Sequence, residues 1–236
     1  MRAPWDVLEP AARGDIEREE RAVGRVERLT GIIFAVAMAL LVLNLVVPQL
    51  EGQPTDAALR DALVQMVPAF FAFVLSFVLL LTCWVLHHFQ FHYFMRTSTA
   101  ILWTNAALML SVALVPFTTA LVSTYSMTRI AVVLYEANLL VMQVLLLLNW
   151  RQAVKTGLLF GGNVPAAVVR RMRVALTVGT ACVLAAMPLA WISPYLSLGL
   201  LVGLAAFYIF LTARGGYTLD AFRRRTTAPP MPPWPI

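Results

Sequence analysis

Forty consecutive residues, Val174 to Ala213, carry no charged side chain, and this feature limits the possible fold more than any other. A helix needs about 20 apolar residues to cross the roughly 30 Å hydrocarbon core of a bilayer. The stretch is therefore long enough for two spans, and Ser193-Pro194 marks the predicted break between them. The apolar residues form continuous runs rather than an alternating pattern, which favours helices over a closed barrel.

Four earlier apolar runs predict four more spans, so the chain is expected to form six. They cover about 29–47, 63–86, 100–122 and 130–150. An acidic loop follows the first run, a polar and aromatic turn with three histidines follows the second, and a long basic loop follows the fourth. Only 13% of the residues are charged, whereas a soluble domain carries about 25%. We therefore expect an all-α integral membrane protein.

The distribution of positive charge predicts the topology of these spans. Of the 18 Lys and Arg residues, 16 lie before the first span, in the histidine turn, in the long loop or in the tail, and only Arg60 and Arg129 lie on the opposite side. Cytoplasmic loops carry the excess of Lys and Arg. We expect a multi-pass protein of the cell (inner) membrane with both termini in the cytoplasm. Since the basic residues flank apolar spans, no nucleic acid is expected as a partner.

Three regions follow from this pattern. Residues 1–28 form a cytoplasmic N-terminal segment, residues 29–213 a six-helix transmembrane domain, and residues 214–236 a basic, proline-rich cytoplasmic tail. The first segment mixes seven acidic residues with six arginines, so it does not have the composition of a secretory signal peptide.

Few residues could carry chemistry, and no known catalytic or nucleotide-binding motif occurs, so we expect neither an enzyme nor a cofactor. His88 and His92 have a spacing that could bind a metal, but no Cys or carboxylate joins them, and no metal site is expected. Glu136 is the only carboxylate inside a span. It is either a functional residue or a hydrogen-bonded side chain between helices.

Small and amide side chains inside the spans are expected to join the helices. Asn44, Asn105, Asn138 and Gln143 should form hydrogen bonds between helices, each worth about 1 kcal/mol or less. Gly199 and Gly203 form a GxxxG pattern, which predicts close helix packing.

Five short motifs, in the same order along the chain, resemble the bacterial branch of the transmembrane protein 175 family, a group of potassium-permeable channels. The resemblance covers roughly residues 25–213. The segments that carry it are Arg25-Val26-Glu27 with Phe34 to Leu43, Trp84-Val85-Leu86-His87-His88, Leu102 to Asn105 with Leu114 to Ala120, Leu134 to Asn138, and Trp191 to Pro194.

The resemblance implies a homotetramer of six-helix subunits in membrane lipid, in which the first helix of each subunit lines a central pore. Potassium and other monovalent cations would pass through this pore. Its narrow part would be formed by Val36, Leu40 and Leu43, which lie at i, i+4 and i+7 and so share one helix face.

The chain also departs from the family pattern. The family's Phe-Ser-Asp becomes Leu29, Thr30 and Gly31, so a hydroxyl is kept while an aromatic ring and a carboxylate are lost. The resemblance implies a hydrogen-bond network between this motif, which begins at Arg25, and neighbouring helices. Its partners here would be His87, Trp103 and Asn105.

A second departure bears on selectivity. The family has a threonine linked to potassium preference where this chain has Ala39, so we expect modest selectivity. Two alternatives remain open from the sequence. One is a proton-coupled carrier that uses Glu136, and the other is a non-conducting membrane scaffold or sensor.

Overall fold

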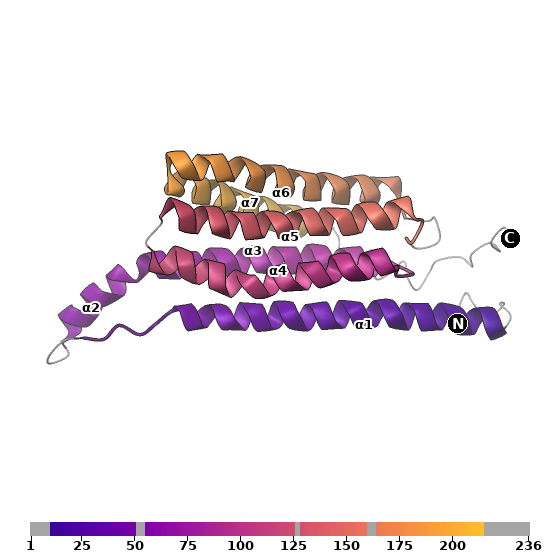
Figure 1. Cartoon of the computed structure of the whole chain (residues 1–236), viewed down its shortest axis with the longest axis horizontal. Helices are drawn as coiled ribbons and strands as arrows, with labels where there is room; N and C mark the ends of the chain where they lie inside the picture. The colour runs from indigo at the N-terminus through magenta and orange to yellow at the C-terminus, as the bar shows by residue number, and fades with distance from the viewer. Residues whose placement is uncertain (1–9, 51–54, 126–127, 160–163, 215–236) are drawn as a thin grey trace.

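The structure is a computed structural model that describes residues 10–50, 55–125, 128–159 and 164–214, and it is a bundle of long helices (Figure 1). Within these ranges no strand is found. The helices are α1 (Pro10–Leu40), the 3₁₀ helix η1 (Leu41–Asn44), α2 (Asp56–Gln65), α3 (Val67–His92), α4 (Thr99–Thr124), α5 (Arg129–Lys155), α6 (Ala166–Ile192) and α7 (Pro194–Arg214).

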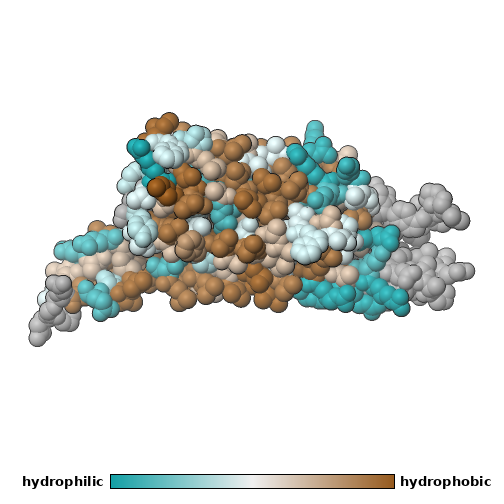
Figure 2. Space-filling view, viewed as in Figure 1, coloured by the Kyte–Doolittle hydropathy of each residue, from teal (hydrophilic) through white to brown (hydrophobic). Residues whose placement is uncertain are grey.

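Six of these helices are long and apolar enough to cross a membrane, which confirms the predicted number of spans. They are Arg21–Asn44, Val67–His92, Thr99–Thr124, Arg129–Lys155, Ala166–Ile192 and Pro194–Leu211. The predicted break is also confirmed, because α6 ends at Ile192 and Pro194 begins α7. Proline fits the first position of a helix, where its missing N–H is not needed. Figure 2 shows apolar surface over the middle of the bundle and hydrophilic surface toward its ends.

Several helices extend beyond the predicted spans, and three of them show why. Helix α1 begins at Pro10 and passes residues 28 and 29 without a break, so the N-terminal segment and the first span share one helix. Helix α3 runs to His92, so the histidines predicted in a turn lie on a helix. Helix α6 begins at Ala166 and includes arginines that were assigned to the long loop. Arg, Glu and Ala are good helix formers, so a helix continues where the apolar run stops.

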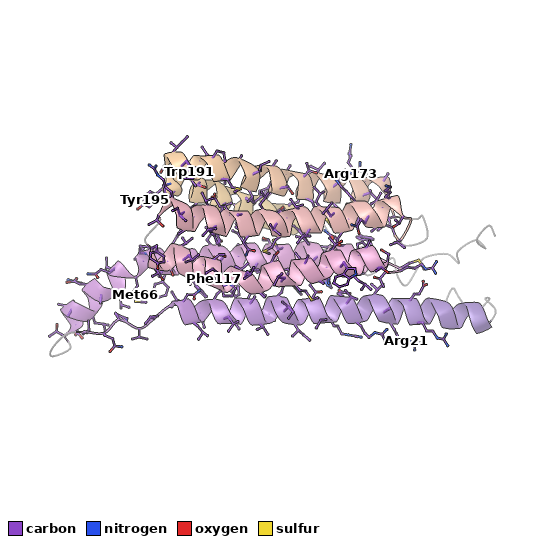
Figure 3. The ribbon with its side chains drawn as sticks, in the orientation of Figure 1. Arg21, Met66, Phe117, Arg173, Trp191 and Tyr195 are labelled. Carbon is purple, nitrogen blue, oxygen red and sulfur yellow. The ribbon has the colours of Figure 1, made fainter. Side chains whose placement is uncertain are left out.

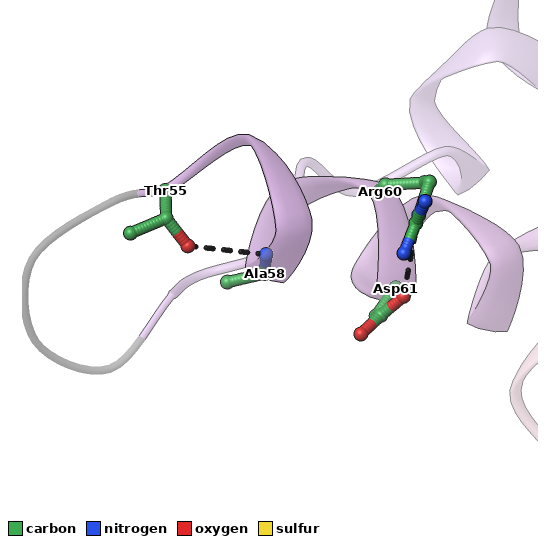
Figure 4. Close-up of polar contacts among 4 residues, drawn as sticks. All are labelled: Thr55, Ala58, Arg60 and Asp61. Atoms are coloured by element: carbon green, nitrogen blue, oxygen red, sulfur yellow. Dashed lines mark hydrogen bonds and ion pairs between the residues drawn. The ribbon is translucent and has the colours of Figure 1, made fainter.

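Helix α2 was not predicted, because residues 56–62 were read as a loop and residues 63–65 as the start of the second span, which instead begins at Val67. The Thr55 hydroxyl caps it by accepting a hydrogen bond from the Ala58 N–H at 3.2 Å, and Arg60 and Asp61 form an ion pair at 3.6 Å (Figure 4). A side-chain cap of this kind stabilises a helix by about 1 kcal/mol. None of its residues is buried, and it projects from the end of the bundle (Figure 1).

The expected hydrogen bonds between helices are present. Asn44 donates to a backbone carbonyl of α4 at 3.0 Å, and Asn138 donates to another at 3.1 Å. The side-chain carbonyl of Gln143, on α5, accepts from the Tyr208 hydroxyl of α7 at 3.2 Å. These bonds pair polar groups that would otherwise be exposed to lipid.

The prediction of close helix packing at Gly199 and Gly203 was wrong within the chain. A Cβ added at Gly199 or Gly203 would have no neighbour within 4 Å, so the GxxxG pattern brings no helix of this subunit close. Gly179 on α6 is the glycine that close packing requires, because a Cβ there would collide with the Tyr208 hydroxyl. The spacing of two glycines does not reveal which side of a helix is covered, and this is why the pattern misled.

The end of α5 is fixed by a glycine in a left-handed conformation. Gly157 has φ of 66°, and the Leu158 N–H donates back to the Ala153 carbonyl at 3.0 Å, as in a Schellman motif. The Leu158 carbonyl in turn accepts from the Met95 N–H at 3.0 Å. These bonds join the α3–α4 connection to the end of α5.

Candidate functional site

Helix α1 is apolar on two faces, and only one of them is covered. The buried face packs on α3 and α4 and contains Val23, Thr30, Phe34, Ala37 and Leu41. Only 22% of the most apolar part of this span is buried, against 33–50% for the other five spans. Helix α1 stands at the edge of the bundle (Figure 1), and within the part of the chain that the structure describes no other helix covers its second face.

The predicted constriction residues lie on this uncovered face. Val36 is 49% exposed, Leu40 is 43% exposed and Leu43 is 69% exposed. Ala39 is also exposed, beside Leu40. Leu43 belongs to η1, where residues turn by about 120° rather than about 100°, so it is rotated away from the ideal i+7 position.

A buried network joins α1 to α3 and α4 and contains three of the predicted residues. The Thr30 hydroxyl donates to the Val26 carbonyl at 2.9 Å and accepts from the Asn105 side-chain amide at 2.7 Å. The Asn105 oxygen lies 2.9 Å from His87 Nε2. An amide oxygen only accepts, so His87 must carry its proton on Nε2. Phe91 stacks on the His87 ring with centroids 4.3 Å apart.

The network forms without the family's carboxylate, because the Thr30 hydroxyl takes the role of acceptor. Gly31, in place of that carboxylate, lies near the Trp84 indole, and a Cβ added there would be 3.7 Å from Trp84 Nε1. Leu29 and Arg25 are exposed and do not enter the network. Trp103 is 74% exposed, so the fold of the chain does not bring it into the network.

A second contact between α1 and α3 lies one turn from the network and was missed in the sequence. Glu27 pairs with His88 Nδ1 at 2.8 Å, and Trp84 stacks on the His88 ring with centroids 5.6 Å apart. Both residues belong to motifs quoted for the resemblance, but the residues lie 61 positions apart and nothing in their spacing indicates a pair. Among the described residues no group of three or more His, Cys, Asp or Glu is placed to hold a metal.

The extension of α1 before the first span is attached to the bundle as well. Glu19 accepts from the Arg96 guanidinium, which lies in the α3–α4 connection. The Glu19 carboxylate raises the pKa of Arg96 above its ordinary value, chiefly through the hydrogen bond. Since the Arg96 side chain is 61% exposed and that of Glu19 36% exposed, solvent weakens the attraction, and such a pair stabilises the fold by at most about 1 kcal/mol.

Glu136 lies away from α1, between α5, α6 and α7. It is fully buried, and one of its oxygens contacts the Ser197 hydroxyl of α7. Ser197 also donates to the Ala186 carbonyl of α6 at 2.9 Å. The other Glu136 oxygen has no partner among the described residues. These contacts place Glu136 between helices, as the second of the two readings expected.

Comparison with known proteins identifies relatives of this chain. The family model described as endosomal/lysosomal potassium channel TMEM175 matches residues 25–116, which contain residues 25–40 of α1, all of η1, α2 and α3, and most of α4. A potassium channel of Streptomyces collinus is 31% identical over 79% of this chain and 91% of its own length. A potassium channel of Chamaesiphon minutus is 31% identical over 80% of this chain and 95% of its own length.

The fold agrees with that relationship. The crystal structure of a lysosomal potassium-selective channel TMEM175 homologue from Chamaesiphon minutus superposes with a TM-score of 0.72 at 30% identity, over 80% of this chain and 97% of that one. The similarity therefore extends over four fifths of the chain rather than over one motif. This chain belongs to the TMEM175 family of potassium channels.

Proposed function

We propose that this chain is the subunit of a cation channel that passes potassium with modest selectivity through a hydrophobic constriction. The uncovered apolar face of α1 is the observation that carries the proposal, because it holds Val36, Leu40 and Leu43 and has no partner within one subunit. The choice of potassium as the ion rests on the relatives that are named as potassium channels.

A single subunit has one such face and cannot enclose an axis with it. Identical subunits close such faces into a ring through cyclic symmetry, and we propose four subunits with α1 facing the axis. The exposed apolar side chains of α4, next to α1, would then pack against the neighbouring subunit. They are Leu102, Trp103, Leu110, Leu114 and Phe117; Figure 3 labels Phe117 on α4.

The proposed pore has neither charge nor carbonyl groups at its narrowest point. A ring of aliphatic side chains resists wetting, so an ion meets a barrier that falls steeply when the ring widens. Selectivity would come from partial dehydration at the neck. Because Ala39 has no hydroxyl to replace a lost water, discrimination between potassium and sodium would be modest.

The charge distribution supports both termini in the cytoplasm. The end of the bundle where α1 begins would then be the inner end, and α2 would lie outside the cell. The exposed Arg60 on α2 and Arg129 at the start of α5 are the only two basic residues assigned to the outer side.

The test is Leu40→Asn, recorded as unitary currents of the purified protein in planar bilayers. An amide at the constriction would wet it, so conductance or leak should rise severalfold. Leu184→Asn is the matched control, since Leu184 is 57% exposed on α6, far from α1. Unchanged currents in a correctly folded Leu40→Asn protein, or the same rise in both variants, would contradict the pore assignment.

A further inference from the structure

Five basic side chains gather where α5 ends and α6 begins. They are Arg151, Lys155, Arg170, Arg171 and Arg173, which we call the α5–α6 basic patch. All five are exposed, and none has an ion pair or a side-chain hydrogen bond among the described residues. No acidic residue occurs between Glu136 and Asp220, so this part of the chain offers no counter-charge.

The two helix ends that carry the patch are held together. The Trp150 indole N–H donates to the Val169 carbonyl at 3.4 Å. These residues immediately precede Arg151 and Arg170, so the bond brings the basic residues of α5 and α6 to the same level of the bundle. Figure 2 shows hydrophilic surface at this end of α6, and Figure 3 places Arg173 there. The cations of α5 and of α6 therefore lie at the same end of the bundle.

The patch continues directly into an apolar face of α6. Arg170, Arg173, Val174 and Val178 lie at i, i+3, i+4 and i+8 and are all exposed, Val174 by 52% and Val178 by 41%. Residues at these intervals share one side of a helix. The guanidinium groups therefore lie at one end of an apolar stripe that would face lipid chains. In a bilayer leaflet the phosphodiester groups lie at that same level.

We propose that the α5–α6 basic patch binds the headgroup of an anionic phospholipid, with the acyl chains along the exposed face of α6. Arginine donates two parallel hydrogen bonds to a phosphate, and its aliphatic stem reaches the headgroup level from a position inside the span. A free phosphate or a nucleic acid would use the charges but not the adjoining apolar stripe. A lipid would use both the charges and the apolar stripe, so we propose a lipid.

The test measures binding of phosphatidylglycerol and of phosphatidylcholine with identical acyl chains to the full chain in neutral detergent, by native mass spectrometry. Phosphatidylglycerol should bind more tightly. Arg170→Gln with Arg173→Gln should weaken its binding on the order of tenfold and leave phosphatidylcholine unaffected. Arg170→Lys with Arg173→Lys keeps the charge and should retain most of the binding.

The matched control is Arg60→Gln with Arg129→Gln, which removes the same formal charge at the other end of the bundle and should leave binding unchanged. Equal weakening in both glutamine variants would show attraction to net charge alone and would overturn the site. So would equal affinity of the unaltered chain for the two lipids. Displacement of phosphatidylglycerol by excess inorganic phosphate would overturn the assignment to a lipid.

Discussion

Thr30 has a single hydroxyl that both donates and accepts in a buried position. It donates to its own helix and accepts from Asn105, so it is the point at which α1 is fixed to α4 and, through Asn105, to His87 of α3. A buried donor left without an acceptor costs about 1–3 kcal/mol. This polar link between α1, α4 and α3 therefore passes through one oxygen atom.

Thr30→Val should lower the unfolding temperature of the detergent-purified protein, with a loss of about 1–3 kcal/mol, because the Asn105 amide loses its acceptor while the volume hardly changes. Thermal unfolding followed by tryptophan fluorescence gives the measurement. Thr180→Val is the control, since Thr180 donates only to the Leu176 carbonyl of its own helix. Equal losses in the two variants would contradict the role given to Thr30.

Gly179→Ala should destabilise the bundle by about 1–3 kcal/mol, as overpacking does, because the added methyl group would displace Tyr208. Gly199→Ala meets nothing within 4 Å and should leave the stability of the subunit unchanged. Comparing the two melting temperatures checks this. A Gly199→Ala protein that melts as low as Gly179→Ala would show that close packing at Gly179 is not the cause.

Part of the candidate site could be predicted from the sequence, and part could not. His87 and Asn105 were expected from the resemblance, because motifs on separate helices indicate which polar groups the family brings together. The pairs of Glu27 with His88 and of Glu19 with Arg96 were not expected, since an ion pair between distant segments depends on the rotation and height of each helix. Those quantities are fixed by packing, not by local spacing.

At the scale of the element, α1 shows how two apolar faces on one helix divide their roles. One face packs on α3 and α4 within the chain, and the other is the face that we propose lines the pore. The change to a 3₁₀ helix at Leu41 shifts Leu43 around the helix axis, so Leu40 is the last of the proposed constriction residues on the α-helical part.

Ala39→Thr should raise the ratio of potassium to sodium permeability about two- to tenfold, which corresponds to one hydrogen bond of about 0.5–1.5 kcal/mol. The added hydroxyl would replace a water that the ion loses at the neck. Reversal potentials under bi-ionic conditions give the ratio. Ala39→Val, which adds the same volume without an oxygen, should not raise it, and an equal rise in both would contradict the explanation.

The six spans were predictable because length and hydropathy alone decide whether a helix can cross lipid. The ends of the helices could not be predicted from hydropathy, since Pro10 to Arg28 and Ala166 to Arg173 are helical without being apolar. Helix α2 was missed for the same reason: a short helix capped by Thr55 and without a buried face leaves no hydropathy signal.

For the whole molecule, we expect four copies of the chain in the conducting particle. Native mass measurement in detergent should give four times 26.1 kDa, because four α1 faces are needed to enclose the proposed axis. A monomer that conducts in bilayers would contradict this assembly.

The orientation of the bundle is open to a direct test. Cysteines placed at Asp56 and at Thr156, both exposed, should differ in their reaction with a thiol reagent that does not cross the membrane of intact cells. Asp56→Cys should react from outside and Thr156→Cys only after permeabilisation. The reverse result would place the termini outside the cell.

The unbroken length of α1 has a mechanical consequence. Its 31 residues make a rod of about 46 Å, held near Thr30 by the bond to Asn105. The arm from Pro10 to Thr30 is about twice as long as the arm from Thr30 to Leu40. If the rod pivots at Thr30, a sideways movement of about 2 Å at its beginning displaces Leu40 by about 1 Å in the opposite direction. The helix would then act as a lever about Thr30, and the contact between Glu19 and Arg96 would restrain its long arm.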